Sequence, residues 1–362
     1  MKQPNERSLT VIVMDVSPVT WGERELIRTA SDKSRLAAGK RSIGPARLEE
    51  CLSAVQCFCS AASSLEKDAV TVLVAVAASE VAVVYPRKDA LEDYFRNPEN
   101  KLDSRNLQSN LLSGVAELMA KASAKQQQAS TTDPSNPPPP LTSNLAAMAS
   151  AFSTALCLIN RFLVAANAGV SALHDHHSWN RGNRDDDGVI AALGGGTSGK
   201  KTSHKYRVWS PRVLLLQASD DRPSDYNAMM NCAFAAVKQQ ILVDACFILS
   251  PSERASKSSS YLEQTCDMTG GLLSTPSAAS QADKALTEVL LTIFLPTRSS
   301  RHRLNQVAIT NLDFRARSFD TGQIVDMAFV CNQCLSIFSQ LPQGRCPTCD
   351  AEIRSKKSKI EP

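Results

Sequence analysis

Short runs of apolar, often β-branched residues alternate with longer amphipathic segments along the first 296 residues of the chain. Runs that are too short for a helix and apolar on both faces predict buried strands, at 8–15, 70–76, 81–85, 208–217 and 241–249. Apolar side chains that recur every three or four residues predict helices, at 45–65, 107–122, 143–162, 226–237, 258–269 and 283–295. This alternation predicts an α/β fold with a doubly wound, mostly parallel sheet covered by helices on both faces.

Local signals refine these elements. The strand at 208–217 contains Pro211 and is expected to be ordered from Arg212. Gly270-Gly271 is typical of a helix C-terminus. Ser17-Pro18 and Trp21-Gly22 predict a loop after the first strand, at the end of the sheet where α/β proteins bind ligands.

Two polar segments interrupt the pattern. Residues 125–140 are rich in Gln, Ser, Thr and Pro, and residues 171–205 contain a His-rich patch, DDD, GGG and KK. Both compositions predict solvated insertions that cannot bury enough apolar surface to order. The expected organisation is a large domain, a connector, a small metal module and a basic tail, at 1–300, 301–328, 329–352 and 353–362.

The metal module is predicted from two Cys-x-x-Cys pairs separated by eleven residues, Cys331, Cys334, Cys346 and Cys349. Two residues between cysteines let one tight turn aim both sulfurs at one ion, and Zn²⁺ takes four thiolates tetrahedrally. Four protein ligands leave no position for a substrate water, so the expected site is structural, with one Zn²⁺ per chain. Ordinary cysteines or two disulfides are the alternative. The apolar residues available for packing the module are Phe329, Leu335, Ile337 and Phe338.

Composition narrows the class of protein. No stretch reaches eighteen consecutive apolar residues, so no transmembrane helix is expected, and the first residues lack the apolar core of a signal peptide. Eleven cysteines then fit a reducing compartment, and the seven outside the metal module are expected to be small buried apolar residues. A net charge of +4 is too small to indicate nucleic-acid binding by itself.

The end of the first strand carries Asp15 and Ser17 in the pattern of an Asp-x-Ser-x-Ser magnesium motif, but Val19 replaces the third oxygen. A hard cation needs several oxygens, which Asp220 or Asp221 could supplement. Weak magnesium binding or none is expected. Trp21 nearby is interpreted either as a contact residue or as a cover for the edge of the sheet.

Two other patterns are interpreted as solvated loops. Residues 194–201 resemble a phosphate-binding loop, yet Lys201 stands where Ser or Thr is needed after Lys200. The His-rich patch at 174–177 lacks a spacing that fixes a coordination shell. No Ser–His–acid or Cys–His arrangement is found, so no enzyme activity is expected.

Several segments together resemble one family. They are LTVIVMDVSPVTWG at 9–22, YNAMMNCAFAAVKQQILVDACFI at 226–248, QTCDMTGGLL at 264–273, LLTIFLP at 290–296, LDFRA at 312–316, FVCNQCLSIF at 329–338 and the CPTCD knuckle at 346–350. In this order they are similar to the von Willebrand factor A-like subunits of the general transcription and DNA repair factor TFIIH, specifically the smaller type with a single C-terminal C4 zinc finger.

The resemblance implies a non-catalytic structural subunit of the TFIIH core, found in the nucleus. It implies a role in RNA polymerase II initiation and nucleotide excision repair through contacts with other subunits, chiefly the second von Willebrand factor A-type zinc-containing subunit. No membrane, small-molecule substrate or direct nucleic-acid contact is expected. The alternative is a zinc-finger protein that binds DNA directly, although Arg345 is the one basic residue in the loop from Leu335 to Arg345.

Two surfaces are candidates for the partner contact. One is the loop face with Ser17, Pro18, Trp21 and Asp220. The other is the zinc module, with Leu335, Ile337 and Phe338.

Overall fold

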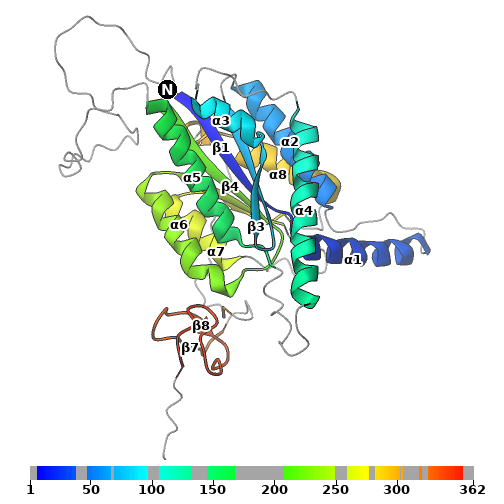
Figure 1. Cartoon of the computed structure of the whole chain (residues 1–362), viewed down its shortest axis with the longest axis vertical. Helices are drawn as coiled ribbons and strands as arrows, with labels where there is room; N and C mark the ends of the chain where they lie inside the picture. Colours follow the sequence, from blue (N-terminus) through cyan, green and yellow to red (C-terminus); the bar gives the residue numbers. More distant parts are fainter. Residues whose placement is uncertain are drawn as a thin grey trace, which may run out of the picture.

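A six-stranded sheet forms the centre of the large domain (Figure 1). The computed structural model describes residues 6–37, 47–66, 69–96, 106–131, 145–167, 208–248, 259–276, 282–301, 303–304, 318–319 and 325–353. The strand order is β3-β2-β1-β4-β5-β6, and each neighbouring pair is parallel except the antiparallel β2–β3 hairpin. The strands are β1 (Glu6–Asp15), β2 (Val70–Ala77), β3 (Glu80–Tyr85), β4 (Val208–Gln217), β5 (Leu242–Phe247) and β6 (Leu273–Ser274).

Helices cover both faces of this sheet because its strands are apolar on both sides. Val11 and Val13 of β1 pack with α5, α6 and α7, whereas Ile12 and Met14 pack with α2, α4 and α8. The doubly wound, mostly parallel α/β class predicted from the sequence is confirmed. The helices are α1 (Pro18–Ala37), α2 (Leu48–Leu65), α3 (Lys88–Arg96), α4 (Leu107–Thr131), α5 (Met148–Asn167), α6 (Tyr226–Lys238), α7 (Ser260–Thr269), α8 (Ala282–Val289) and α9 (Arg298–Arg301).

The loop predicted after the first strand is wrong, because α1 begins there at Pro18. Proline suits the first turn of a helix, where its missing N–H would have no partner in any case. The amide of Trp21 donates to the carbonyl of Ser17 at 3.2 Å, which places Trp21 and Gly22 inside the first turns. The C-terminal turns of α1 project from the body of the molecule (Figure 1).

Other elements also differ from the prediction. Helix α3 was not predicted, and α4 runs to Thr131, so the first residues of the expected insertion at 125–140 are helical. The rest of that insertion, and the one at 171–205, lie outside the described residues. Strand β4 pairs with β1 from Val208 rather than Arg212, and it pairs with β5 only from Arg212 onward. Pro211 therefore sits where β4 has one neighbour, and its lack of an N–H costs little.

Of the described residues, only the segment Met148–Ala165 of α5 is long and apolar enough to span a membrane. Half of that segment is buried inside the protein. Phe152, Ile159 and Phe162 are among the most buried side chains of the core that α5 forms with the sheet. The apolarity of α5 is therefore explained by its place as a core helix.

The C-terminal module is a small hairpin with its own core. Strands β7 (Phe329–Val330) and β8 (Ile337–Phe338) are antiparallel. Phe338 packs with Cys331 and Cys346. Phe329 and Leu335, which were candidates for packing the module, are instead largely exposed.

Candidate metal centre

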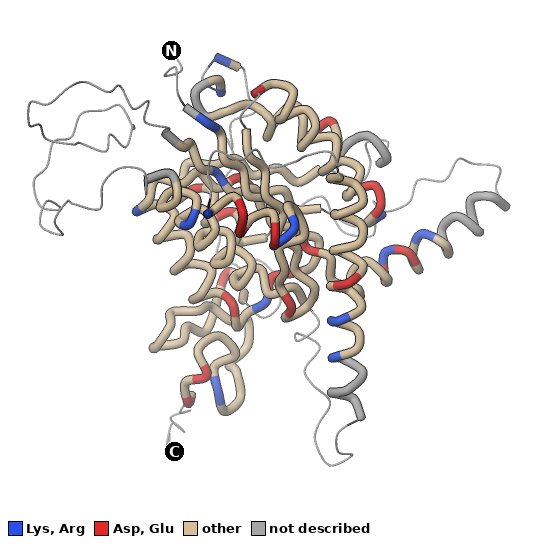
Figure 2. Tube along the Cα trace, turned by 45° about the horizontal axis from the view of Figure 1, so that its top comes forward, with Lys and Arg blue, Asp and Glu red and all other residues tan. Residues whose placement is uncertain are grey.

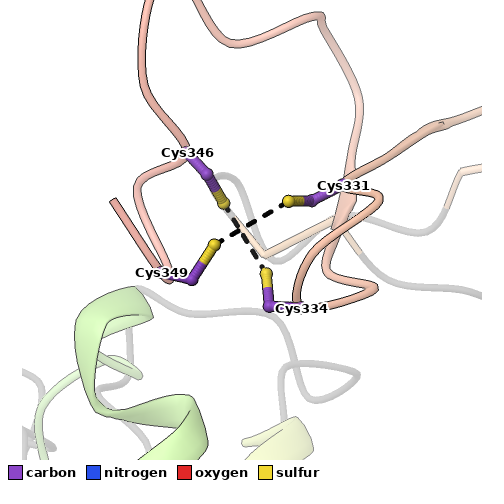
Figure 3. A group of neighbouring side chains, drawn as sticks. All are labelled: Cys331, Cys334, Cys346 and Cys349. Atoms are coloured by element: carbon purple, nitrogen blue, oxygen red, sulfur yellow. Dashed lines mark hydrogen bonds between the residues drawn. The ribbon is translucent and has the colours of Figure 1, made fainter. Parts of the chain in front are cut away.

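The four C-terminal cysteines converge on one point (Figure 3). Their Sγ atoms all lie within 4.8 Å of one another, with 3.8 Å between Cys331 and Cys349 and 3.7 Å between Cys334 and Cys346. Four sulfurs at about 2.3 Å from a tetrahedral ion are separated by about 3.8 Å. A disulfide needs about 2.05 Å, so the thiols are spaced for a metal ion and not for two disulfides.

The two halves of the site repeat the same backbone arrangement. In each, the amide four residues after the first cysteine donates to that cysteine's carbonyl at 2.9 Å, which closes a tight turn. The donor residue adopts the left-handed conformation in both halves, with φ of 60° at Leu335 and 58° at Asp350. This turn presents both sulfurs of a Cys-x-x-Cys pair on one side, which is why the spacing predicts the site.

Backbone amides also favour a thiolate at Cys331. Hydrogen bonds from the Cys334 and Gln333 amides lower the pKa of the Cys331 thiol to about 7. Burial raises the pKa of the Cys346 thiol. Thiolates, not thiols, bind metal ions, so among these candidate ligands Cys331 has the thiol that ionises most readily near neutral pH.

The magnesium-like motif at the end of β1 is occupied by the protein's own hydrogen bonds. The Asp15 carboxylate accepts from the amides of Ser17 at 3.0 Å, Ala218 at 3.2 Å and Ser219 at 2.7 Å. Ser17 Oγ accepts from the Ala78 amide. These bonds tie together the carboxyl ends of three adjacent strands, and Val19 supplies no further oxygen.

The carboxylates expected to supplement this motif have other surroundings. Asp221 accepts from Ser259 Oγ at 2.5 Å and from the Tyr261 amide at 3.4 Å, so it caps the N-terminus of α7. Burial raises the pKa of Asp221. Asp220 is exposed. Among the described residues, the four cysteines form the one cluster with metal-ligand geometry.

The loop face is a poorer contact surface than the sequence suggested. Ser17 and Trp21 are buried, so they are not available to a partner. Trp21 Nε1 donates to the Asp15 carbonyl at 2.9 Å, and Arg24 Nη2 bridges the carbonyls of Ala218 and Ile248. Trp21 is therefore a buried covering residue and not an exposed contact residue, and it covers the carboxyl end of the central strand β1 instead of the edge of the sheet.

Sequence reasoning missed a groove between α6 and α7. It has a volume of 470 Å³ and is lined by Tyr226, Asn227, Met230, Asn231, Phe234, Gln264, Asp267 and Met268. Phe234 belongs to the apolar pattern that predicts the helix at 226–237, yet it is 60% exposed. The sequence contained one sign of this groove. The apolar residues at 229, 230, 233, 234 and 237 form a helix face that is wider than packing against the sheet requires.

The remaining candidates add no site. The glycine-rich loop at 194–201, the His-rich patch at 174–177 and the basic tail lie outside the described residues. Cys57 and Cys157 are exposed, contrary to prediction, whereas Cys51, Cys59, Cys246 and Cys266 are buried and Cys232 is half-buried. In the part of the chain that the structure describes, basic and acidic residues are interspersed without a stripe of one sign (Figure 2).

Comparison with known proteins identifies the family. The family described as "Transcription factor Tfb4" matches residues 7–350. The TFIIH subunit TFB4 of Yarrowia lipolytica is 38% identical over 148 residues, covering 40% of this chain and 42% of that protein. General transcription factor IIH subunit 3 of Dictyostelium discoideum is 38% identical over 146 residues, covering 40% and 36%. These alignments thus span about two fifths of the relatives' own length.

A solved structure titled as the TFIIH p34 N-terminal domain is also similar, with 18% sequence identity and a TM-score of 0.49 over 79% of this chain and 96% of that one. The family match extends from the first strand through the second cysteine pair, so it includes both the sheet and the metal centre. The chain belongs to the Tfb4 transcription factor family.

Proposed function

We propose that this chain is a non-catalytic structural subunit of TFIIH, acting in the nucleus in RNA polymerase II initiation and nucleotide excision repair. The observation that carries the proposal is the family match over residues 7–350. The names of the relatives, which are TFIIH subunits from several eukaryotes, support it. In this proposal the chain acts by binding other subunits through the sheet domain at 1–300 and the module at 329–352, which the connector at 301–328 joins.

Zinc is the proposed metal, bound by Cys331, Cys334, Cys346 and Cys349. Four soft sulfurs at tetrahedral spacing fit Zn²⁺, and the set leaves no open coordination position. The ion would cross-link the two halves of the module and supply no Lewis-acid site for a substrate. Its contribution would be to fold a module whose own apolar core is very small.

The proposed main partner is the second von Willebrand factor A-type zinc-containing subunit of the same complex. The large domain would make the principal contact, because a stable interface usually buries more than about 1,000 Å², beyond what the small module offers alone. The groove between α6 and α7, which carries the exposed side chain of Phe234, is the part of the large domain that we assign to this contact.

The zinc module would add to this contact through Leu335. A left-handed conformation costs an L-residue about 1–2 kcal/mol, and Leu335 adopts it while 70% of the residue is exposed. The left-handed backbone of Leu335 closes the Cys331–Cys334 turn, but its apolar side chain is not buried in the module, which supports a role of that side chain in binding.

The test is retention of that partner subunit by the tagged full chain. Phe234→Asp should abolish most of the retention and Leu335→Asp should reduce it. Leu65→Asp, at an exposed leucine on α2, should leave it unchanged. Full retention by both Phe234→Asp and Leu335→Asp would contradict the assigned surfaces. Absence of retention by the unmodified chain, together with DNA binding that weakens steeply with salt, would support the DNA-binding alternative instead.

A further inference from the structure

Two residues of the connector, Ser318 and Phe319, belong structurally to the zinc module. The Phe319 amide donates to the Ile337 carbonyl at 2.8 Å, and the Ser339 amide donates to Ser318 Oγ at 2.7 Å. Ser318 is buried. These bonds hold the pair alongside β8: Phe319 bonds to Ile337, the first residue of the strand, and Ser318 bonds to Ser339, which follows its last residue.

The ring of Phe319 points the other way, into the large domain. Its centroid lies 4.7 Å from that of Tyr226 with the planes 81° apart, and 6.0 Å from that of Tyr261. The two tyrosine rings lie 5.3 Å apart. Tyr226 and Tyr261 occupy the first turns of α6 and α7, and an edge-to-face arrangement is a favourable aromatic contact.

Phe319 therefore joins two separate cores. It packs against the core formed by the sheet with α5, α6 and α7, and also against the core of Cys331, Phe338 and Cys346. Figure 1 shows the β7–β8 hairpin beside the ends of α6 and α7, which agrees with these contacts. We call Ser318, Phe319, Tyr226 and Tyr261 the aromatic clasp.

We propose that the zinc module docks on the N-terminal ends of α6 and α7 through the aromatic clasp, and that zinc binding is thermodynamically coupled to the packing of these helices. The coupling rests on the proposed zinc site. When the metal folds the module, β8 fixes the backbone of Phe319 and presents its ring to the two tyrosines. Coupling between sites is reciprocal, so docking should tighten zinc binding as zinc stabilises the helix ends.

The clasp also connects the metal centre to the groove. Tyr226 contacts Phe319 on one side and lines the groove between α6 and α7 on the other. Loss of zinc would release the ring that packs on Tyr226. Zinc binding would thereby change the packing of Tyr226 in the groove, although no residue that lines the groove binds the metal.

The experiment compares full chains carrying Phe319→Ala or Phe329→Ala. Phe329 is the matched control, because it is a half-exposed phenylalanine of the same module and lies outside the ring cluster. Hydrogen exchange is measured on α6 and α7 with zinc bound and after chelation. Chelation should accelerate exchange in their first two turns in the unmodified chain and in Phe329→Ala. In Phe319→Ala these turns should exchange rapidly with or without zinc.

Zinc affinity, measured by competition with a chelating dye, gives the reciprocal readout. Phe319→Ala should retain one zinc per chain and weaken its binding roughly tenfold, the equivalent of one or two aromatic contacts. Tyr226→Ala, which alters no residue of the module, should weaken it similarly, and the double variant should show little further loss.

The outcomes separate the two proposals. An unmodified chain that binds no zinc would overturn the zinc assignment and the coupling together. One equivalent of zinc, with exchange in α6 and α7 insensitive to chelation, would overturn the coupling alone. Zinc affinity in Tyr226→Ala equal to that of the unmodified chain would do the same.

Discussion

Asp15 belongs to a cation-binding sequence pattern, yet in this structure its carboxylate accepts hydrogen bonds from backbone amides. Its carboxylate accepts three backbone amides at the carboxyl ends of adjacent strands, while Val19 offers no oxygen to a cation. Asp15→Asn should destabilise the large domain by about 1–3 kcal/mol, because an amide NH₂ would face backbone donors. Millimolar Mg²⁺ should leave the melting temperature unchanged in both proteins. A magnesium-dependent rise that Asp15→Asn removes would revive the cation site.

Leu335 and Asp350 occupy equivalent left-handed positions in the two halves of the metal centre. Replacing either by glycine should relieve backbone strain and stabilise the zinc-bound module by about 1 kcal/mol. Chelator competition measures this gain.

Asp350→Gly is the matched control for the side chain of Leu335. Only Leu335→Gly should weaken retention of the partner subunit, because the Asp350 carboxylate bonds locally to Arg345 at 2.7 Å. Equal retention by the two variants would show that the exposed leucine contributes no contact.

At the scale of elements, α9 is fixed to the sheet by a buried ion pair. Arg301 donates two hydrogen bonds to Asp244 of β5, at 2.7 and 2.5 Å, and Asp244 is fully buried. Arg301→Ala leaves that carboxylate without its ion-pair partner, although the Leu272 amide still donates to it at 3.0 Å, and should cost about 3–5 kcal/mol of unfolding free energy.

The exposed pair of Lys121 and Glu117 on α4 is the comparison for Arg301. Its side chains are 64% and 68% exposed, so solvent screens the pair and Lys121→Ala should cost far less stability than Arg301→Ala. Denaturant unfolding of both variants checks the ranking. A cost for Arg301→Ala as small as that for Lys121→Ala would mean that the carboxylate finds another partner.

Loss of the zinc module's fold should loosen the first turns of α6 and α7 but leave the rest of the large domain folded, since each part has its own core. Cys346→Ser removes one of four ligands and should abolish tight zinc binding and order in residues 329–350. The cooperative unfolding of the large domain should persist. Metal analysis tests the loss of zinc, and calorimetry tests whether the large domain still unfolds cooperatively. A full equivalent of tightly bound zinc in the variant would refute the ligand assignment.

Proton release on zinc binding follows from the thiol pKa values. Cys331, with a pKa of about 7, is mostly protonated at pH 6 and mostly a thiolate at pH 8. Burial raises the pKa of Cys346, so that thiol is protonated at both pH values. Zinc uptake should therefore release more protons at pH 6 than at pH 8, with the difference coming from Cys331, and affinity should fall as pH decreases. Equal release at the two pH values, followed with an indicator, would contradict the assignment to Cys331.

The elements that sequence predicted well are those with local causes. Each Cys-x-x-Cys pair forms its own turn, so the ligands can be recognised without knowing the fold. Buried strands such as β1 and β5 are apolar on both faces because helices cover both sides. Helix α1 escaped prediction because Gly22 and a largely polar sequence resemble a loop.

Features of the whole molecule were beyond sequence reasoning because they depend on neighbours distant in the chain. The groove needs α6 beside α7, which the pattern of either helix alone does not specify. Phe319 stands between polar residues in the sequence, and its importance follows only from the two tyrosines that it contacts. The same holds for Asp221, whose role as a helix cap depends on the start of α7.

The aromatic clasp joins two parts of one chain, so a weak contact is enough to keep the zinc module docked on the large domain. Thirteen residues, 305–317, separate Leu304 from Ser318, so Phe319 remains within about 50 Å of the large domain even when undocked. Such a tether gives an effective concentration in the millimolar range. A contact too weak to join separate fragments 1–304 and 305–362 at micromolar concentration would still be mostly closed in the intact chain. A single proteolytic cut within 305–317 would therefore free the zinc module from the sheet domain without altering any residue of the aromatic clasp.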